Sequence, residues 1–132
     1  MAIIMQYGKG TGANSRGTGR KTVLWSNSAP TSSFAAKTVN LSDSVTNYDF
    51  LLVVLAFSTG TQDHSTDLIP VDDILGGAEY SLRINAASQN RTGGRSITVP
   101  TATTATFGTG AYNGSSSQNG YAIPVAIYGV KL

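Results

Sequence analysis

Short runs of β-branched and aromatic residues recur along this chain, and segments rich in Gly, Ser, Thr and Asn separate them. A series of such runs with turn-forming residues between them is typical of antiparallel sheets. We therefore expect an all-β fold, an antiparallel, jelly-roll-like β-sandwich of roughly seven to nine strands without a long helix. The expected strands are Thr22–Ser26, Ala36–Leu41, Phe50–Ser58, Leu68–Val71, Glu79–Ala86, Arg95–Val99, Thr101–Phe107 and Tyr121–Lys131.

The pattern of apolar residues predicts how deeply individual strands are buried. Ala36–Leu41 and Glu79–Ala86 alternate between apolar and polar residues, which predicts half-buried strands. Phe50–Ser58 is a continuous apolar run too short for a typical capped helix, so we expect a central strand buried on both faces. Pro70 would confine Leu68–Val71 to a sheet edge.

Polar segments between these strands are expected to form surface loops at residues 59–67, 88–94 and 109–121. Within them, Asn90–Gly94 predicts a turn with left-handed glycines. Asp72–Gly77 predicts one helical turn closed by glycine.

The chain offers few side chains for catalysis. Its 132 residues form one domain and include one histidine, His64, one glutamate, Glu79, and no cysteine. Catalysis usually needs groups that titrate near neutral pH, or a nucleophile beside a base. We therefore expect no enzyme and no cofactor. A glycosidase pair such as Asp49 and Asp72 is geometrically possible, so a polysaccharide depolymerase is the enzymatic alternative.

Metal and nucleotide sites are not expected. Asp63-His64-x-x-Asp67 matches no dedicated metal-binding loop, and we interpret it as a solvated acidic loop. Gly12 and Gly17 have the spacing of a phosphate-binding loop, but the Lys-Ser/Thr pair that should follow is missing. The basic residues are not interleaved with aromatic residues, so we expect no nucleic-acid partner.

Residues 1–20 are expected to form an N-terminal anchor and flexible arm, followed by the sandwich domain at 21–132. The stretch Gly8–Lys21 contains five glycines and four basic residues. Ordering so many glycines has a high entropic cost, and the stretch has few side chains that could pack in a core. It is either a flexible tail or an arm that orders on a partner. Its candidate docking residues are Lys9, Arg16, Arg20 and Lys21.

Charges are segregated along the chain. Residues 1–42 contain five basic residues and no acid, residues 43–79 contain all seven acids and no base, and residues 80–132 contain four basic residues and no acid. Such blocks suit a homo-oligomer in which positive and negative surfaces meet, although chance is the alternative in a chain with few charges.

The polar loops also suit recognition of a carbohydrate or another receptor. Sugar sites combine aromatic platforms with amide and guanidinium hydrogen-bonding groups. The candidate receptor- or glycan-binding residues are Tyr112, Asn113, Gln118, Asn119, Tyr121, Asn90 and Arg91.

Four short segments carry a resemblance to a known group of proteins. They are Lys21–Ser26 (KTVLWS), Val39–Ser44 (VNLSDS), Asn47–Leu51 (NYDFL) and Ile127–Lys131 (IYGVK). The combination resembles small C-terminal β-sandwich domains of tailed-bacteriophage tail-fibre, head-fibre and related virion surface proteins, over roughly residues 21–132.

This resemblance implies a bacteriophage virion structural protein, of the tail-fibre-tip, adhesin or capsid-decoration type, and often a homotrimer. It supplies no catalytic residues. Its expected partners are other virion proteins and a glycan or protein receptor on the host surface. Residues 1–20 would serve as the attachment arm, because no long stalk precedes the domain. The alternative from another class is a monomeric, lectin-like carbohydrate-binding module.

We expect synthesis in the host cytoplasm without a signal peptide, and a location on the virion as the resemblance implies. Met1–Met5 is apolar but too short for the core of a signal peptide. The longest apolar run, Phe50–Phe57, is far shorter than the ~20 residues of a membrane span. We therefore expect no membrane insertion.

Overall fold

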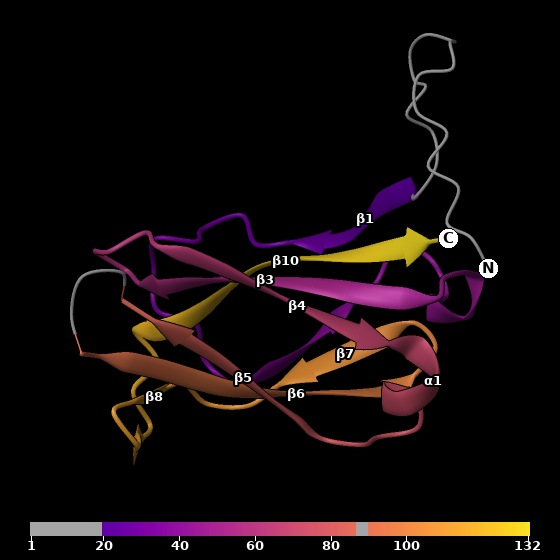
Figure 1. The fold of residues 1–132 in the computed structure, drawn as a ribbon. Helices are drawn as coiled ribbons and strands as arrows, with labels where there is room; N and C mark the ends of the chain where they lie inside the picture. The colour runs from indigo at the N-terminus through magenta and orange to yellow at the C-terminus, as the bar shows by residue number, and fades with distance from the viewer. Residues whose placement is uncertain (1–19, 87–89) are drawn as a thin grey trace, which may run out of the picture.

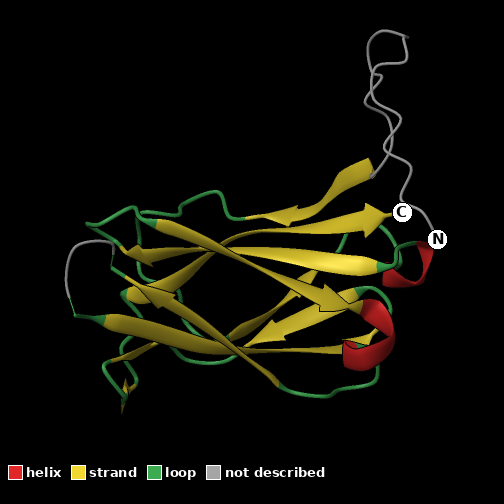
Figure 2. Cartoon of the chain, in the orientation of Figure 1, coloured by secondary structure: helices red, strands yellow, loops and turns green. Residues whose placement is uncertain are grey.

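The fold is a sandwich of two antiparallel β-sheets, as the sequence predicts (Figure 1). The structure is a computed structural model that describes residues 20–86 and 90–132. Strands dominate these residues, and the helical segments are confined to short turns (Figure 2). The 3₁₀ turn η2 spans Val45–Asn47, and helix α1 spans Val71–Ile74.

The first sheet, here called sheet A, has four strands in the order β1-β10-β3-β4. They are β1 Arg20–Ser26, β10 Tyr121–Lys131, β3 Phe50–Ser58 and β4 His64–Pro70.

The second sheet, sheet B, has six strands, in the order β2-β7-β6-β8-β9 with β5 paired to the other side of β6. They are β2 Lys37–Asn40, β5 Tyr80–Asn85, β6 Thr92–Thr101, β7 Thr104–Phe107, β8 Ala111–Tyr112 and β9 Ser115–Ser116.

The core lies between the two sheets and follows the predicted alternation. Val39 in β2 and the pair Leu82 and Ile84 in β5 are buried, whereas their polar neighbours in sequence are exposed. Three aromatic rings pack against each other in part of the core. The ring centroids of Trp25, Phe34 and Phe107 lie 5.6–5.9 Å apart. Burial of such apolar surface is the main driving force for this fold.

The short segments that carry the resemblance meet at one corner of sheet A. The carboxylate of Asp43 accepts hydrogen bonds from the Ser44 N–H at 2.8 Å, the Asn47 amide at 3.0 Å and the Tyr48 hydroxyl at 2.9 Å. These bonds to its charged form, first that from the Tyr48 hydroxyl and then that from the Ser44 N–H, hold the pKa of Asp43 below its usual value. The Tyr48 ring lies against Gly129 of β10. These motifs therefore have a structural role, since they fasten the η2 turn to β10.

The structure corrects the expected burial of β3. Leu51, Val53 and Leu55 face the core and are fully buried, but Leu52 and Val54 on the opposite face are only half-buried. The reason is that no described part of the chain packs over that face of sheet A, so β3 is central within its sheet but covered on one side only.

Several expected boundaries also move. Strand β4 begins at His64, so the expected loop at 59–67 is shorter, while Pro70 does lie on an edge strand. Asn90–Gly94 is not a turn with left-handed glycines, because Gly93 and Gly94 pair with β5 inside β6. Pairing with neighbouring strands overrides the turn preference of this Gly-rich stretch.

Two further segments differ from expectation. Arg20 and Lys21, assigned to the arm, lie in β1 and pair with Lys131 and Val130 of β10. The loop at 109–121 contains the small hairpin of β8 and β9. The remaining arm candidates, Lys9 and Arg16, lie outside the described residues.

Candidate functional site

The predicted loops gather at one end of the sandwich, here called the loop end. The Thr59 N–H donates to the Gly120 carbonyl at 3.1 Å, and the Thr92 N–H donates to the Asn113 side chain at 2.8 Å. These bonds join the three loops expected at residues 59–67, 88–94 and 109–121. The opposite end, the terminal end, holds Arg20, α1 and the C-terminus (Figure 1).

The aromatic candidates at the loop end stack on each other. The rings of Tyr112 and Tyr121 are stacked with centroids 4.3 Å apart, and Tyr121 also meets Phe57 edge-on at 5.6 Å. The Arg91 guanidinium lies 4.9 Å above the Phe57 ring. Each tyrosine therefore has one ring face occupied within the protein. Both rings are half-buried, so only part of each ring is accessible to a ligand.

The amide candidates divide into two groups. The side-chain oxygens of Asn113 and Asn119 accept bonds from the backbone N–H groups of Thr92 and Gly110, so these residues build the loop. Asn113 is also in the left-handed backbone region, with a φ of 47°, which asparagine tolerates. Asn90 and Gln118 are exposed and remain open to a receptor.

A buried arginine fixes both ends of the 109–121 loop. Arg95 is only 4 % exposed, and its guanidinium donates to the carbonyls of Gly108 at 2.7 Å, Tyr121 at 3.1 Å and Ala122 at 2.8 Å. Ala122 has a φ of 49°, a strained value for alanine that surrounding contacts must hold in place. A Cβ on Gly110 would lie 2.7 Å from the Arg95 guanidinium, which explains the glycine.

The positive charge of Arg95 is balanced by carbonyl dipoles rather than by a carboxylate. Burial lowers the pKa of Arg95 to about 10, because desolvation disfavours its charged form. The group therefore stays protonated at neutral pH. Its charge adds to the positive potential of sheet B, whose strands contain no acidic residue.

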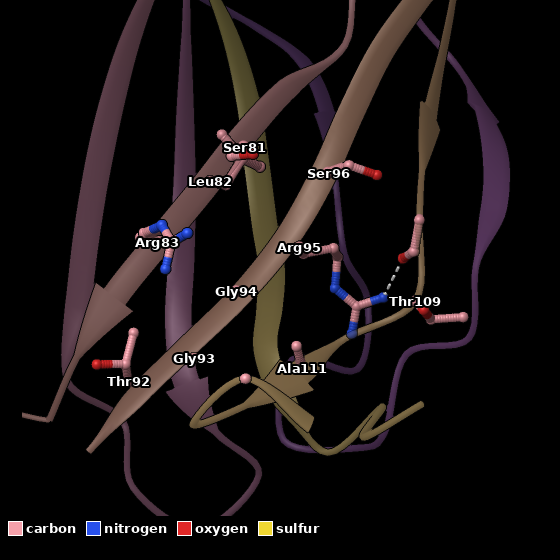
Figure 3. Close-up of a pocket in the computed structure, with 12 residues that line it drawn as sticks. Ser81, Leu82, Arg83, Thr92, Gly93, Gly94, Arg95, Ser96, Thr109 and Ala111 are labelled. Carbon is pink, nitrogen blue, oxygen red and sulfur yellow. Dashed lines mark hydrogen bonds between the residues drawn. The ribbon is translucent and has the colours of Figure 1, made fainter. Parts of the chain in front are cut away.

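A shallow trough of about 420 Å³ lies over β5, β6 and the start of the β8–β9 hairpin (Figure 3). Gly94 lies directly opposite Arg83 in the sheet, and the missing side chain leaves open space beside that guanidinium. The lining combines hydroxyl groups, arginine and backbone, without a carboxylate. It consists of Ser81, Leu82, Arg83, Thr92, Gly93, Gly94, Arg95, Ser96, Gly108, Thr109, Ala111 and Gly114.

The chemistry of the trough suits a ligand rich in hydroxyl groups that carries negative charge. Serine and threonine hydroxyls both donate and accept hydrogen bonds, and an arginine fork pairs with carboxylates or phosphates. The site residues predicted from the sequence do not include Ser81, Arg83, Thr92, Ser96 or Thr109. The alternation in Glu79–Ala86 already placed Ser81 and Arg83 on the outward face, so a signal for part of this site was present.

Other features of the described residues give no further site. Within 20–86 and 90–132, no three His, Asp or Glu side chains cluster to hold a metal ion. No helix in this part of the chain has the length and apolarity needed to cross a membrane. The chain matches no protein-family model, and no curated protein matches it in sequence.

Proposed function

We propose that this chain is a structural protein on the surface of a bacteriophage virion, which presents the loop end of its sandwich to the host. The observation that carries this proposal is the separation of the two ends. The loops at 59–63 and 109–121 lie at one end, and Arg20, the first described residue of the domain, lies at the other (Figure 1). A domain held at its terminal end would project its loops outward.

The construction of the loop end supports a role in contact with another surface. Loops on a rigid scaffold are the usual carriers of binding residues. Here Arg95 fixes both ends of the 109–121 loop, and the Tyr112–Tyr121 stack joins β8 to the start of β10. A fixed loop loses little conformational freedom on binding, which favours affinity. The exposed residues Asn90 and Gln118 are the expected contacts.

Attachment to the particle would use the basic residues at the terminal end. Arg20 and Lys21 are held in β1, and the chain that contains Lys9 and Arg16 enters the domain there. We propose that this basic region docks on other virion proteins, and that the protein is a homotrimer of the tail-fibre-tip or capsid-decoration type.

Location on the particle is the first test. Antibodies raised against the purified protein should label particles of the phage that encodes it, in immunogold electron microscopy. Particles carrying a Gln118→Arg, Asn90→Arg variant should contain as much of the protein but adsorb to host cells more slowly. Asn40→Arg in β2, also exposed, is the matched control. Unlabelled particles would contradict the virion assignment, and normal adsorption of the double variant would contradict the role of the loop end.

The trough supports a second candidate function, binding of an acidic saccharide by a lectin-like domain. Its hydroxyl groups and Arg83 form an acid-free lining that complements sugar hydroxyls and a uronic-acid carboxylate. On an array of neutral and acidic glycans, the wild-type protein should bind acidic ones, and Arg83→Ala should lose this binding. Lys37→Ala removes the same charge from β2, outside the trough, and should bind normally. Equal binding by both variants would contradict the site.

A further inference from the structure

The face of sheet A that points away from sheet B, here called the outer face, is apolar. Strand pairing aligns Val23 of β1, Tyr128 of β10, Leu52 of β3 and Leu68 of β4 in one row across the whole sheet. Val23 is 51 % exposed and Leu68 is 55 % exposed, and the two residues between them are half-buried. A contiguous exposed apolar patch usually marks an interaction surface.

The neighbouring rows extend this surface. One row aligns Lys21, Val130, Phe50 and Pro70. Another aligns Ser26, Ala126, Val54 and Thr66, of which Ala126 is only 4 % exposed. Lys21 is the single charged residue in these three described rows, and its ammonium group lies 4.4 Å above the Tyr128 ring. The face of an antiparallel sheet that is open to solvent normally carries polar residues, as the outward face of β5 does. The composition of the outer face therefore indicates that something covers it.

The edges of the outer face carry opposite charges at the same level along the strands. Lys21 lies on the β1 edge, in the row that ends at Pro70 on the β4 edge, and Arg20 precedes it in β1. Pro70 leads directly into α1, where Asp72 and Asp73 are exposed. A second copy placed side by side, with its strands parallel to the first, would bring its basic edge level with these acids.

We propose that the outer face of sheet A is the contact between copies of this chain, with the β1 edge of each subunit against the β4–α1 edge of its neighbour. The apolar rows supply buried area, and the edge charges select the parallel arrangement. This arrangement points all loop ends in the same direction. The inference names the contact surface of the proposed homo-oligomer, but it depends neither on a virion nor on a glycan.

The oligomeric mass of the purified full-length protein tests this contact. Light scattering should give a multiple of the 13.7 kDa chain mass for the wild type. Leu68→Glu should reduce the mass to that of a single chain, whereas Asn40→Glu on sheet B should leave it unchanged. Both residues are exposed on strands, so circular dichroism should show the same fold in each. A single-chain wild type, or an unchanged mass for Leu68→Glu, would overturn the proposal.

A charge exchange tests the identity of the partner edge. Lys21→Glu should weaken association by about tenfold, because it places like charges at the contact. Adding Asp72→Lys and Asp73→Lys to Lys21→Glu should restore association, since a second copy then presents complementary edges again. Failure of this restoration would overturn the arrangement. Association that appears only after deletion of residues 1–19 would also overturn it, because the chain's own N-terminus would then cover the face. The adsorption and glycan tests are separate from these outcomes.

Discussion

Gly129 of β10 is the position where adding one methyl group should reveal how the corner of sheet A is built. A Cβ there would lie 2.6–2.7 Å from three atoms of the Tyr48 ring, closer than real Cβ contacts allow. The backbone of Gly129 is not in the left-handed region, so alanine itself meets no conformational barrier. Forcing the ring outward is overpacking, which costs about 1–3 kcal/mol. For a domain of this size, Gly129→Ala should lower Tm by roughly 4–12 °C.

A double-mutant cycle identifies Tyr48 as the cause. Tyr48→Ala should destabilise the domain by about 1–3 kcal/mol through lost packing of a half-buried ring. In that background the steric conflict is gone, so Gly129→Ala should change stability by less than about 0.5 kcal/mol.

The matched control is Gly94→Ala in β6, where the nearest atom to the new Cβ is the Leu82 carbonyl oxygen at 3.6 Å, an ordinary contact. This change should be near neutral. Stability is measured by urea denaturation and thermal melting followed by circular dichroism. Additive effects of Gly129→Ala and Tyr48→Ala, or equal effects of Gly129→Ala and Gly94→Ala, would refute the reasoning.

Three ionisable groups give further predictions, each measured by urea denaturation. Arg95→Leu should cost about 2–4 kcal/mol, because three carbonyls lose their donor; a cost below about 1 kcal/mol would contradict the role of this arginine as a clamp. Asp43→Asn should lower the free energy of unfolding at neutral pH. Its difference from wild type should shrink as pH falls below 3.8 through the lowered pKa of Asp43. A difference in unfolding free energy that does not depend on pH would contradict this. Asp67 should behave in the opposite way. Burial raises the pKa of its carboxyl group, and its Oδ2 atom is buried without a hydrogen-bond partner. Wild type should therefore gain stability as pH falls through that pKa. Asp67→Asn should be more stable than wild type at neutral pH and should lack this gain.

Much of the fold could be predicted because the apolar and polar pattern of each strand indicates which of its residues are buried. Alternation in Glu79–Ala86 assigned Leu82 and Ile84 to the core, and the structure confirms both. Errors arose where local preference and strand pairing disagree. Gly93 and Gly94 favour a turn locally, yet they occupy β6 because β5 and β8 pair with them on either side.

The candidate site was less predictable, because its key contacts join residues far apart in the chain. Nothing near Arg95 in sequence shows that it fastens the carbonyls of Tyr121 and Ala122. The same holds for the Tyr112–Tyr121 stack, since two tyrosines in one loop can equally point outward to a ligand. Local sequence indicates which side chains can bind, but tertiary contacts decide which of them are already used.

The charge blocks of the sequence become separate surfaces in the fold, and this separation gives the two proposed contacts different sensitivities to salt. All seven acids lie in residues 43–79, so the strands of sheet B contain no carboxylate, while Asp72 and Asp73 border sheet A. Binding of an anion in the trough would rest mainly on charge, which salt screens over about 10 Å at 0.1 M. Association through the outer face would rest mainly on apolar burial, which salt does not weaken. Rising ionic strength should therefore abolish glycan binding while the protein is still oligomeric. Loss of both together would mean that the edge charges, rather than the row from Val23 to Leu68, hold the subunits together.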